Sequence, residues 1–329
     1  MQKDLLKKLG IKIGHYTDSQ NITGLTCFIS EKGAHIGIDI RGSNTGSLNT
    51  PAFEPKAAGK LVYGVVLTGG STYGLESAFG IMNYLEENGI GNKTRAGLVP
   101  EITGAVIYDI AVGSSKVRPT VKNGYDTANK SSYDDFSQGS IGVGTGATTG
   151  KWGLGKPLKG GFGIGVVNLP NDIIVAAFVV TNAIGDTINP KTGKFYSETG
   201  NQNLNNYDFQ NQNLSEYTGL MKLQKHNTTL AVIATNVALY KTQLMKVAEL
   251  THDGMARSIF PIHTNMDGDI VFALSSQSGE FKAVKDIPEI SLIDIIGTAS
   301  ADALSIAIKN SILNAKGIEG FPSYSESYR

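Results

Sequence analysis

The sequence predicts an α/β fold in which two β-sheets pack face to face and helices cover their outer sides. Forty glycines in 329 residues punctuate short β-branched, apolar segments, as is typical of strands joined by tight turns. These segments come in runs, and a few longer segments have the 3.6-residue spacing of helices. Strands in runs, with helices available to cover them, favour a layered sandwich.

Most of the predicted strands lie in the first part of the chain. Each is a short apolar run bounded by Gly, Asn, Asp or Pro. They are residues 11–15, 24–30, 34–40, 64–67, 104–112, 140–146, 161–168 and 173–180.

One helix is predicted between residues 75 and 89, where apolar side chains fall on one face and a glycine follows at the capping position. These are Leu75, Ala78, Phe79, Met82, Leu85 and Gly89.

The last third of the chain is predicted to hold a strand, a helix, a strand and a long helix. The strands are 228–236 and 269–274. The first helix lies near 241–257, and the second runs from Pro288 to about Ala315, before Gly317. The inward residues of the first helix are Leu244, Val247, Ala248 and Met255.

Composition excludes several classes of function. The net charge is zero and no basic patch stands out, so we expect no nucleic-acid partner. The first residues lack an apolar signal core, and no uninterrupted apolar run approaches the roughly 20 residues of a membrane span, so we expect no membrane partner. A single cysteine, Cys27, sits in an apolar run, which favours a buried core thiol and a cytoplasmic location.

The pair Asn227-Thr228 joins a breakable bond to a potential nucleophile, at the start of a predicted strand. If the bond is cut, Thr228 gains a free α-amine with a pKa of about 7.7 to 8, which can take the proton of its own hydroxyl. The polar stretch from Ser197 to Lys225 precedes the pair as a loop. Asn-Thr-Thr is also a glycosylation sequon and an ordinary way to begin a strand, so the triplet alone is weak.

The segment Asp267-Gly268-Asp269 places two carboxylates on one side of a strand. We expect them to accept hydrogen bonds from Thr228 and to titrate as a unit. A metal site formed by Asn265, Asp267 and Asp269 is the alternative, but the spacing lacks the Gly and distant Glu of a calcium loop. We therefore expect no metal and no other cofactor.

Two glycine-rich segments invite a phosphate-binding interpretation. Residues 144–152 resemble a phosphate loop, but Thr145 replaces a required Gly and Trp152 a required Ser or Thr. Residues 69–74 open a helix after a strand, so their N–H groups suit an anion or an oxyanion, or simply a tight turn.

Residues 227–274 resemble the nylon-oligomer (6-aminohexanoate oligomer) hydrolases, in the DmpA-like, self-cleaving N-terminal nucleophile hydrolases of peptidase family S58. The resemblance rests on Asn227-Thr228-Thr229, on residues 232–237 and on residues 261–269, and it is weakest at 197–225. The motifs at 13–15, 69–76 and 105–109 fit the wider group. The resemblance implies a four-layer αββα sandwich over residues 1–329, self-cleaved into 1–227 and 228–329. β-Aminopeptidases of the group have Ser-x-Glu in place of Asp-x-Asp, which favours the nylon-oligomer branch.

Three further side chains are predicted at the site. Lys151 matches the family's active-site lysine, and a lysine beside an N-terminal amine lowers the pKa of that amine; on its own it would be a solvated charge. Asn182 ends an apolar strand, where its amide suits an oxyanion hole or turns the chain. Tyr108 resembles the family's active-site tyrosine, with core packing as the alternative.

The predicted mechanism uses Thr228 twice, first against the carbonyl of Asn227 and then against an amide substrate. The resemblance implies linear or cyclic 6-aminohexanoate oligomers and polyamides as substrates, and a homo-oligomer of cleaved units, commonly a tetramer. Three alternatives stay open: a β-peptidyl or L-amino-acid aminopeptidase, an acyltransferase on a similar scaffold, and an uncleaved, non-catalytic relative.

Overall fold

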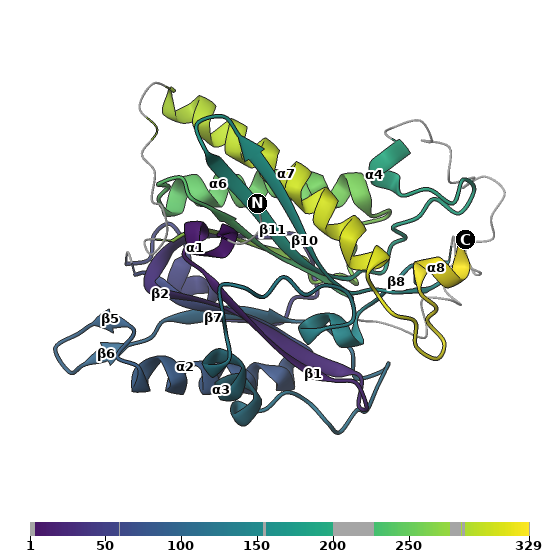
Figure 1. Cartoon of the computed structure of the whole chain (residues 1–329), viewed down its shortest axis with the longest axis horizontal. Helices are drawn as coiled ribbons and strands as arrows, with labels where there is room; N and C mark the ends of the chain where they lie inside the picture. Colours follow the sequence, from purple (N-terminus) through teal and green to yellow (C-terminus); the bar gives the residue numbers. More distant parts are fainter. Residues whose placement is uncertain are drawn as a thin grey trace.

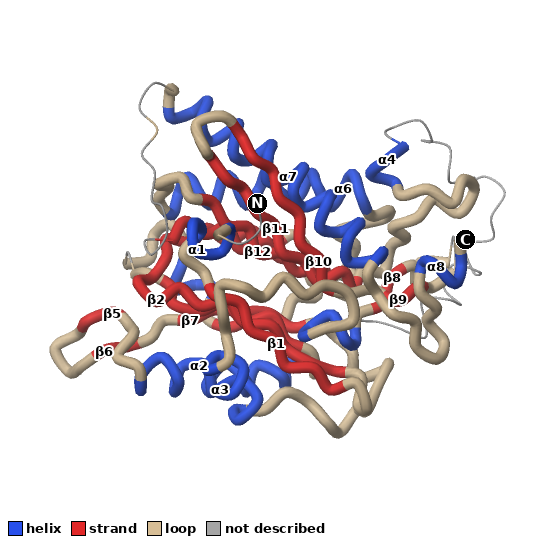
Figure 2. The backbone as a smooth tube through the Cα atoms, viewed as in Figure 1, coloured by secondary structure: helices blue, strands red, loops and turns tan. Residues whose placement is uncertain are grey.

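A computed structural model describes residues 4–58, 60–153, 156–199, 227–276, 284 and 287–328. Its helices and strands form the predicted sandwich of two sheet layers between two helical layers (Figures 1 and 2). The loop predicted at 197–225 lies outside the described residues from 200 onward.

The first helical and sheet layers come mainly from the first half of the chain. Their strands are β1 (Lys12–Asp18), β2 (Thr23–Ile40), β3 (Ser47–Leu48), β4 (Val62–Thr68) and β7 (Ile102–Val106). The helices α2 (Glu76–Glu87) and α3 (Val121–Asn129) cover the outer side of this layer. Three short helices precede them in the sequence: α1 (Leu5–Leu9), η1 (Thr50–Phe53) and η2 (Ser71–Leu75).

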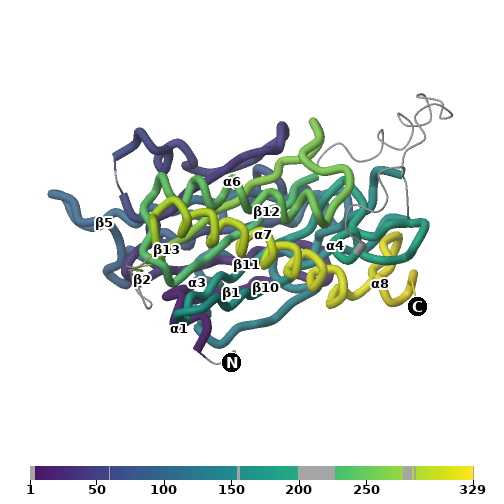
Figure 3. Tube along the Cα trace, turned by 90° about the horizontal axis from the view of Figure 1, so that it is seen from above, coloured from purple at the N-terminus to yellow at the C-terminus, as the bar shows by residue number. Residues whose placement is uncertain are grey.

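The second sheet layer consists of β10 (Phe162–Leu169), β11 (Ile173–Asn182), β12 (Thr228–Thr235) and β13 (Ile270–Ser276). The helices α6 (Lys241–Ser258) and α7 (Glu289–Leu313) cover it, and α7 lies along β10 and β11 (Figure 3). The smaller elements are β5 (Asn92–Lys93), β6 (Leu98–Val99), η3 (Gly142–Gly146), β8 (Thr148–Thr149), β9 (Leu158–Lys159), α4 (Tyr196–Thr199) and α8 (Tyr324–Ser327).

The two layers are joined through β2, which is long enough to belong to both. Its first half pairs with β1 and β4, and its second half pairs with β13. The register shifts between Ile29 and Ala34, where the strand passes from one layer to the other. The hydrogen-bonded order is therefore continuous, β10-β11-β12-β13-β2-β4-β7-β3, with β1 beside β2.

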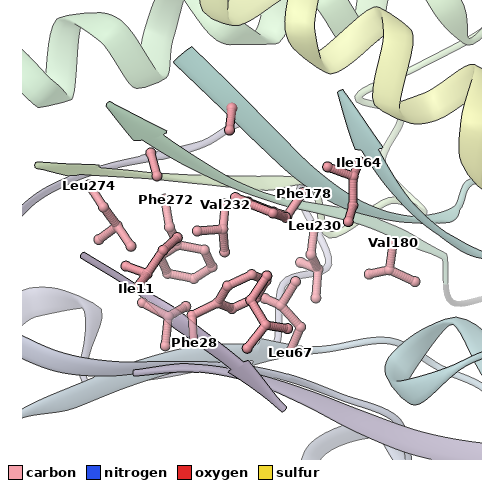
Figure 4. Close-up of a cluster of buried hydrophobic side chains, with 14 of the residues drawn as sticks. Ile11, Phe28, Leu67, Ile164, Phe178, Val180, Leu230, Val232, Phe272 and Leu274 are labelled. Atoms are coloured by element: carbon pink, nitrogen blue, oxygen red, sulfur yellow. The ribbon is translucent and has the colours of Figure 1, made fainter. Parts of the chain in front are cut away.

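Alternation along β11 shows why both faces of the second layer are buried. Ile174, Ala176, Phe178 and Val180 point to the core between the sheets, and the intervening residues point to α6 and α7. Phe28 and Phe178 meet between the layers with ring centroids 5.4 Å apart, and Phe272 lies in the same cluster (Figure 4). The helix α7 is long and apolar enough to cross a bilayer, but half of its most apolar stretch is buried against this layer, as in a core helix.

Several predicted elements need correction. The two strands at 24–30 and 34–40 are the single strand β2. The strand at 104–112 ends at Val106, and a turn in which Val112 and Gly113 N–H donate to Asp109 O follows. Residues 140–146 contain a 3-10 helix rather than a strand, since Gly142 adopts a φ of 53° and packs where a Cβ would lie 2.3 Å from Thr26 Oγ1. Phe79 is 53% exposed instead of inward.

Candidate active site

Thr228 is the first residue of β12 and lies directly opposite Asn182, the last residue of β11. Side chains of directly opposed residues in antiparallel strands are close neighbours, with Cβ atoms about 4.5 to 5.5 Å apart. Thr228 is only 4% exposed and Asn182 is fully buried. The fold thus brings together two predicted site residues that are 46 positions apart (228 − 182).

The bond between Asn227 and Thr228 is held by the segment that precedes β13. Asn227 forms a parallel bridge with Asp267: its N–H donates to Met266 O at 3.0 Å, and its carbonyl accepts from Gly268 N–H at 2.8 Å. The Thr228 hydroxyl donates to the same carbonyl oxygen at 2.5 Å. The carbonyl that a self-cleaving threonine would attack is therefore polarised by one N–H and touched by the nucleophile itself.

The amide of Asn182 has a fixed orientation. Its Oδ1 accepts from Thr148 N–H at 3.0 Å and from Lys151 Nζ at 3.3 Å. Two donors on one atom identify it as the oxygen, so the NH₂ group faces away from them. Within the described part of the chain, Asn182 Nδ2 is buried without a hydrogen-bond partner. Such a donor suits a negative charge that develops during reaction.

Lys151 lies beside this amide and also donates to Thr148 Oγ1 at 3.1 Å. Burial lowers the pKa of Lys151 to about 7, against the opposing attraction of the Asp267 carboxylate. A lysine with such a pKa is partly neutral near neutral pH and can accept a proton. Lys151 is only partly exposed and its ammonium donates to Thr148 and Asn182, which does not fit the alternative of a freely solvated surface charge.

The two aspartates hold the backbone around Thr228 rather than Thr228 itself. Asp267 accepts from Ile184 N–H at 3.2 Å and from the N–H and hydroxyl of Thr264 at 3.1 and 2.6 Å. Asp269 accepts from Thr229 N–H at 2.7 Å. The expected hydrogen bonds from Thr228 are thus absent among the described contacts of the intact chain. The reason is that the Thr228 hydroxyl is engaged by Asn227 and its α-amine does not exist before cleavage.

The aspartate pair is nevertheless coupled. Burial, and then the nearby charge of Asp269, raise the pKa of Asp267 to about 6. In the described part of the chain no cluster of three or more His, Cys, Asp or Glu side chains is arranged to hold a metal ion.

His263 was given no role by the sequence, yet it contacts the pair directly. Its Nδ1 lies 2.8 Å from Asp269 Oδ2, and its backbone N–H donates to the same oxygen at 3.2 Å. His263 has a φ of 58°, and its ring packs against His252 with centroids 4.8 Å apart. The position of His263 within residues 261–269 was the only sign in the sequence that it lies near the site. The structure shows that His263, at its positive φ, meets Asp269.

A second lysine, Lys159, binds backbone carbonyls near the site. Lys159 is fully buried and donates to the carbonyls of Gly144, Ala147 and Gly160 at 2.7 to 2.9 Å. The first two carbonyls belong to the segment that delivers Thr148 to Asn182, and Gly160 directly follows β9, the strand that pairs with β8. Residues 144–147 fold around Lys159, and Lys151 donates to Asn182, which accounts for this glycine-rich segment without a bound phosphate.

The glycine turn at 69–74 already binds an anionic group of the chain. Gly70 N–H donates to Asp109 Oδ1 at 2.6 Å, and Thr23 donates to the other oxygen at 2.8 Å. Asp109 is 1% exposed and occupies the place where an external anion would bind. Tyr108 precedes it, partly buried, two residues beyond the end of β7 in the first sheet layer.

Comparison with known proteins shows the family of the chain. The model of peptidase family S58 matches residues 9–325. An uncharacterized aminopeptidase of Mycobacterium leprae is 33% identical, over 96% of this chain and 91% of that protein. A 6-aminohexanoate-oligomer endohydrolase of Paenarthrobacter ureafaciens is 28% identical, over 81% of this chain and 73% of that protein.

Among solved structures, the L-aminopeptidase D-Ala-esterase/amidase of Ochrobactrum anthropi, described as a variant of the Ntn hydrolase fold, has a TM-score of 0.66 at 20% identity. It covers 93% of this chain, and this chain matches 84% of it, which confirms the predicted fold. Because the family model spans nearly all of the sequence, the chain belongs to peptidase family S58 and is an amide-bond hydrolase.

Proposed function

We propose that the chain is a self-processing amide hydrolase, which cuts itself between Asn227 and Thr228 and then uses Thr228 as its N-terminal nucleophile. One observation carries this proposal. The Thr228 hydroxyl touches the Asn227 carbonyl oxygen, which Gly268 N–H also holds, and the opposing residue Asn182 offers a buried, unpartnered N–H donor.

Maturation proceeds in two steps. Thr228 Oγ attacks the carbonyl carbon of Asn227, and the C–N bond breaks as the nitrogen takes up a proton, which leaves an ester on Oγ. Water then hydrolyses the ester to a carboxylate at Asn227 and a free hydroxyl and amine at Thr228. The products are residues 1–227 and 228–329.

The mature site repeats this chemistry on a substrate. The new α-amine, or Lys151 with its lowered pKa, takes the hydroxyl proton as Thr228 attacks an amide. Asn182 Nδ2 stabilises the oxyanion, a contribution of about 3 to 4 kcal/mol in comparable sites. Tyr108 is a second candidate donor. Asp269 aligns the backbone after Thr228 through Thr229 N–H, and Asp267 aligns the backbone after Asn182 through Ile184 N–H.

Two substrate classes are candidates. The segments 227–237 and 261–269 and the endohydrolase relatives favour 6-aminohexanoate oligomers and related polyamides. The relatives with higher identity and fuller coverage bear aminopeptidase names, which favours removal of N-terminal residues from peptides. We extend the proposal to a cytoplasmic location and to a homo-oligomer of cleaved units, commonly a tetramer. The assembly is supported by the position of β10 and β3, which end the described sheet, because sheet edges need cover.

A denaturing gel with mass spectrometry tests the nucleophile. We expect the 34.9-kDa chain to give two fragments, the smaller beginning at Thr228. A chain that stays intact under all conditions and hydrolyses no amide would contradict the proposal. Product analysis with 6-aminohexanoate oligomers, amino-acid p-nitroanilides and added amine acceptors then separates endo-hydrolysis, aminopeptidase activity and acyl transfer.

A further inference from the structure

The segment 266–268 contacts the residue before the scissile bond through its backbone. Met266 O accepts the N–H of Asn227, and Gly268 N–H donates to the carbonyl of Asn227. Both contacts are made to one residue, and they span the atoms N, Cα, C and O of a single α-amino acid. Asn227 is 1% exposed, so the arrangement is a closed site around one aminoacyl unit.

Self-cleavage would break the covalent link that holds Asn227 in this site. In the ester intermediate the acyl group on Thr228 Oγ is Asn227 itself, and a substrate's acyl-enzyme has the same bond to the same atom. The segment 266–268 is anchored independently, because Asp267 O accepts from Asn44 N–H at 2.9 Å, and Asp267 N–H donates to Thr264 O at 3.1 Å. Release of Asn227 therefore frees one acceptor and one donor beside the nucleophile.

We propose that Met266 O and Gly268 N–H form the acyl subsite of the mature enzyme, and that this subsite selects α-aminoacyl groups. The inference rests on the proposed function and adds to it the chemistry of the preferred substrate. The substrate's N–H donates to Met266 O and its carbonyl accepts from Gly268 N–H, as those of Asn227 do in the intact chain.

Spacing discriminates between the two candidate substrate classes. An α-aminoacyl group has one carbon between its nitrogen and its carbonyl and reaches both backbone groups at once. A β-aminoacyl group is longer by one C–C bond of about 1.5 Å. A 6-aminohexanoyl group places a methylene where Met266 O requires a donor. The Met266 carbonyl is then left without a hydrogen-bond donor, which weakens binding.

The chain itself provides the first test. Asn227→Ala keeps the N–H that donates to Met266 O, and Asn227→Pro removes it, so the two variants form a matched pair. We expect the alanine variant to mature at least tenfold faster than the proline variant, with thermal melting to confirm that both are folded. Equal maturation rates would overturn the role of Met266 O.

Substrates with one common leaving group provide the second test. The cleaved enzyme is assayed with the p-nitroanilides of L-alanine, propionic acid, β-alanine and 6-aminohexanoic acid. We expect kcat/KM for L-alanyl p-nitroanilide to exceed the other three by at least tenfold, which corresponds to about 1.4 kcal/mol. Comparable values for the propionyl or 6-aminohexanoyl compound would refute the subsite and leave the amidase intact. Failure of the cleaved protein to hydrolyse any of the four would remove the amidase function and the subsite with it.

Discussion

Replacement of Gly268 by alanine is expected to block maturation by crowding the nucleophile. A Cβ at this position would lie 2.6 Å from Asn44 O and 2.8 Å from Thr228 Oγ1. A carbon and an oxygen that are not bonded rarely approach closer than 3.0 Å, so something must move by several tenths of an ångström. Asn44 cannot yield easily, because its own N–H donates to Asp267 O. The displacement therefore falls on Thr228 or on the backbone of residues 266–268 that holds Asn227.

The size of the effect follows from these distances. Overpacking of this kind costs about 1 to 3 kcal/mol of stability. A misplacement of about 1 Å at a reacting atom can cost about 100-fold in rate. We expect self-cleavage of the Gly268→Ala variant to slow by about 30- to 100-fold, while the melting temperature falls only by several degrees.

A time course of the intact band on a denaturing gel measures this effect. Gly64→Ala, in β4 and away from Thr228, is the matched control, because its Cβ would lie 3.1 Å from the Cγ2 methyl of Ile102. The control is expected to mature normally. Wild-type cleavage by a folded Gly268→Ala variant would refute both the crowding and the use of the observed Thr228 position in maturation.

Five further predictions concern the same site and its assembly. Thr228→Ala is expected to abolish maturation and hydrolysis together, and substantial cleavage at 227/228 in that variant would end the nucleophile assignment. Lys151→Ala and Asn182→Ala should each lose at least 100-fold in turnover with little change in melting temperature; normal activity with a much lower melting temperature would show a structural role. Activity should rise as pH increases through about 7, where Lys151 loses its proton, and should fall further below about 6 as Asp267 is protonated. Asp267→Asn or Asp269→Asn should abolish most activity with modest loss of stability. For Asp267 the loss is modest because its pKa is raised, so the carboxyl group contributes less stability as pH rises through about 6. Chelator-sensitive activity restored by calcium or magnesium would instead show a metal site. Light scattering at micromolar concentration should give at least a dimer of cleaved units, and a monomeric mass would exclude the proposed assembly.

Local sequence patterns predicted the second sheet layer well. The strands β11, β12 and β13 are mostly apolar runs, α6 has helical spacing, and Pro288 and Gly317 bound α7, so a short window was sufficient for each. The glycine-rich first half was harder to interpret. Residues 140–146 look like a strand by composition, but close packing of Gly142 against Thr26 imposes a 3-10 helix, and this contact is not visible in the sequence.

The site was predicted by residue type but not by contact. Thr228 and Asn182 were identified separately, and only the register of β11 with β12 shows that they face each other. The aspartates were expected to hold the nucleophile, whereas they hold Ile184 and Thr229 N–H groups instead. Gly268 was seen only as the spacer between two acids. Its role depends on a backbone N–H, which every residue except proline carries and no sequence pattern can reveal.

The position of β12 and β13 in the sheet determines what a cut at Asn227 leaves behind. These two strands lie between β11 on one side and β2 on the other, both from the segment before the cut. The shorter fragment would therefore be threaded through the middle of the longer one rather than docked against it. Dilution alone would not separate the two fragments. Dissociation would require the β11–β12 and β13–β2 pairings to break together and the apolar contacts of α6 and α7 with the sheet to be lost. If the chain is cut there, the intact precursor would be the form in which these interleaved strands assemble, and two fragments expressed apart would have to form both strand interfaces anew.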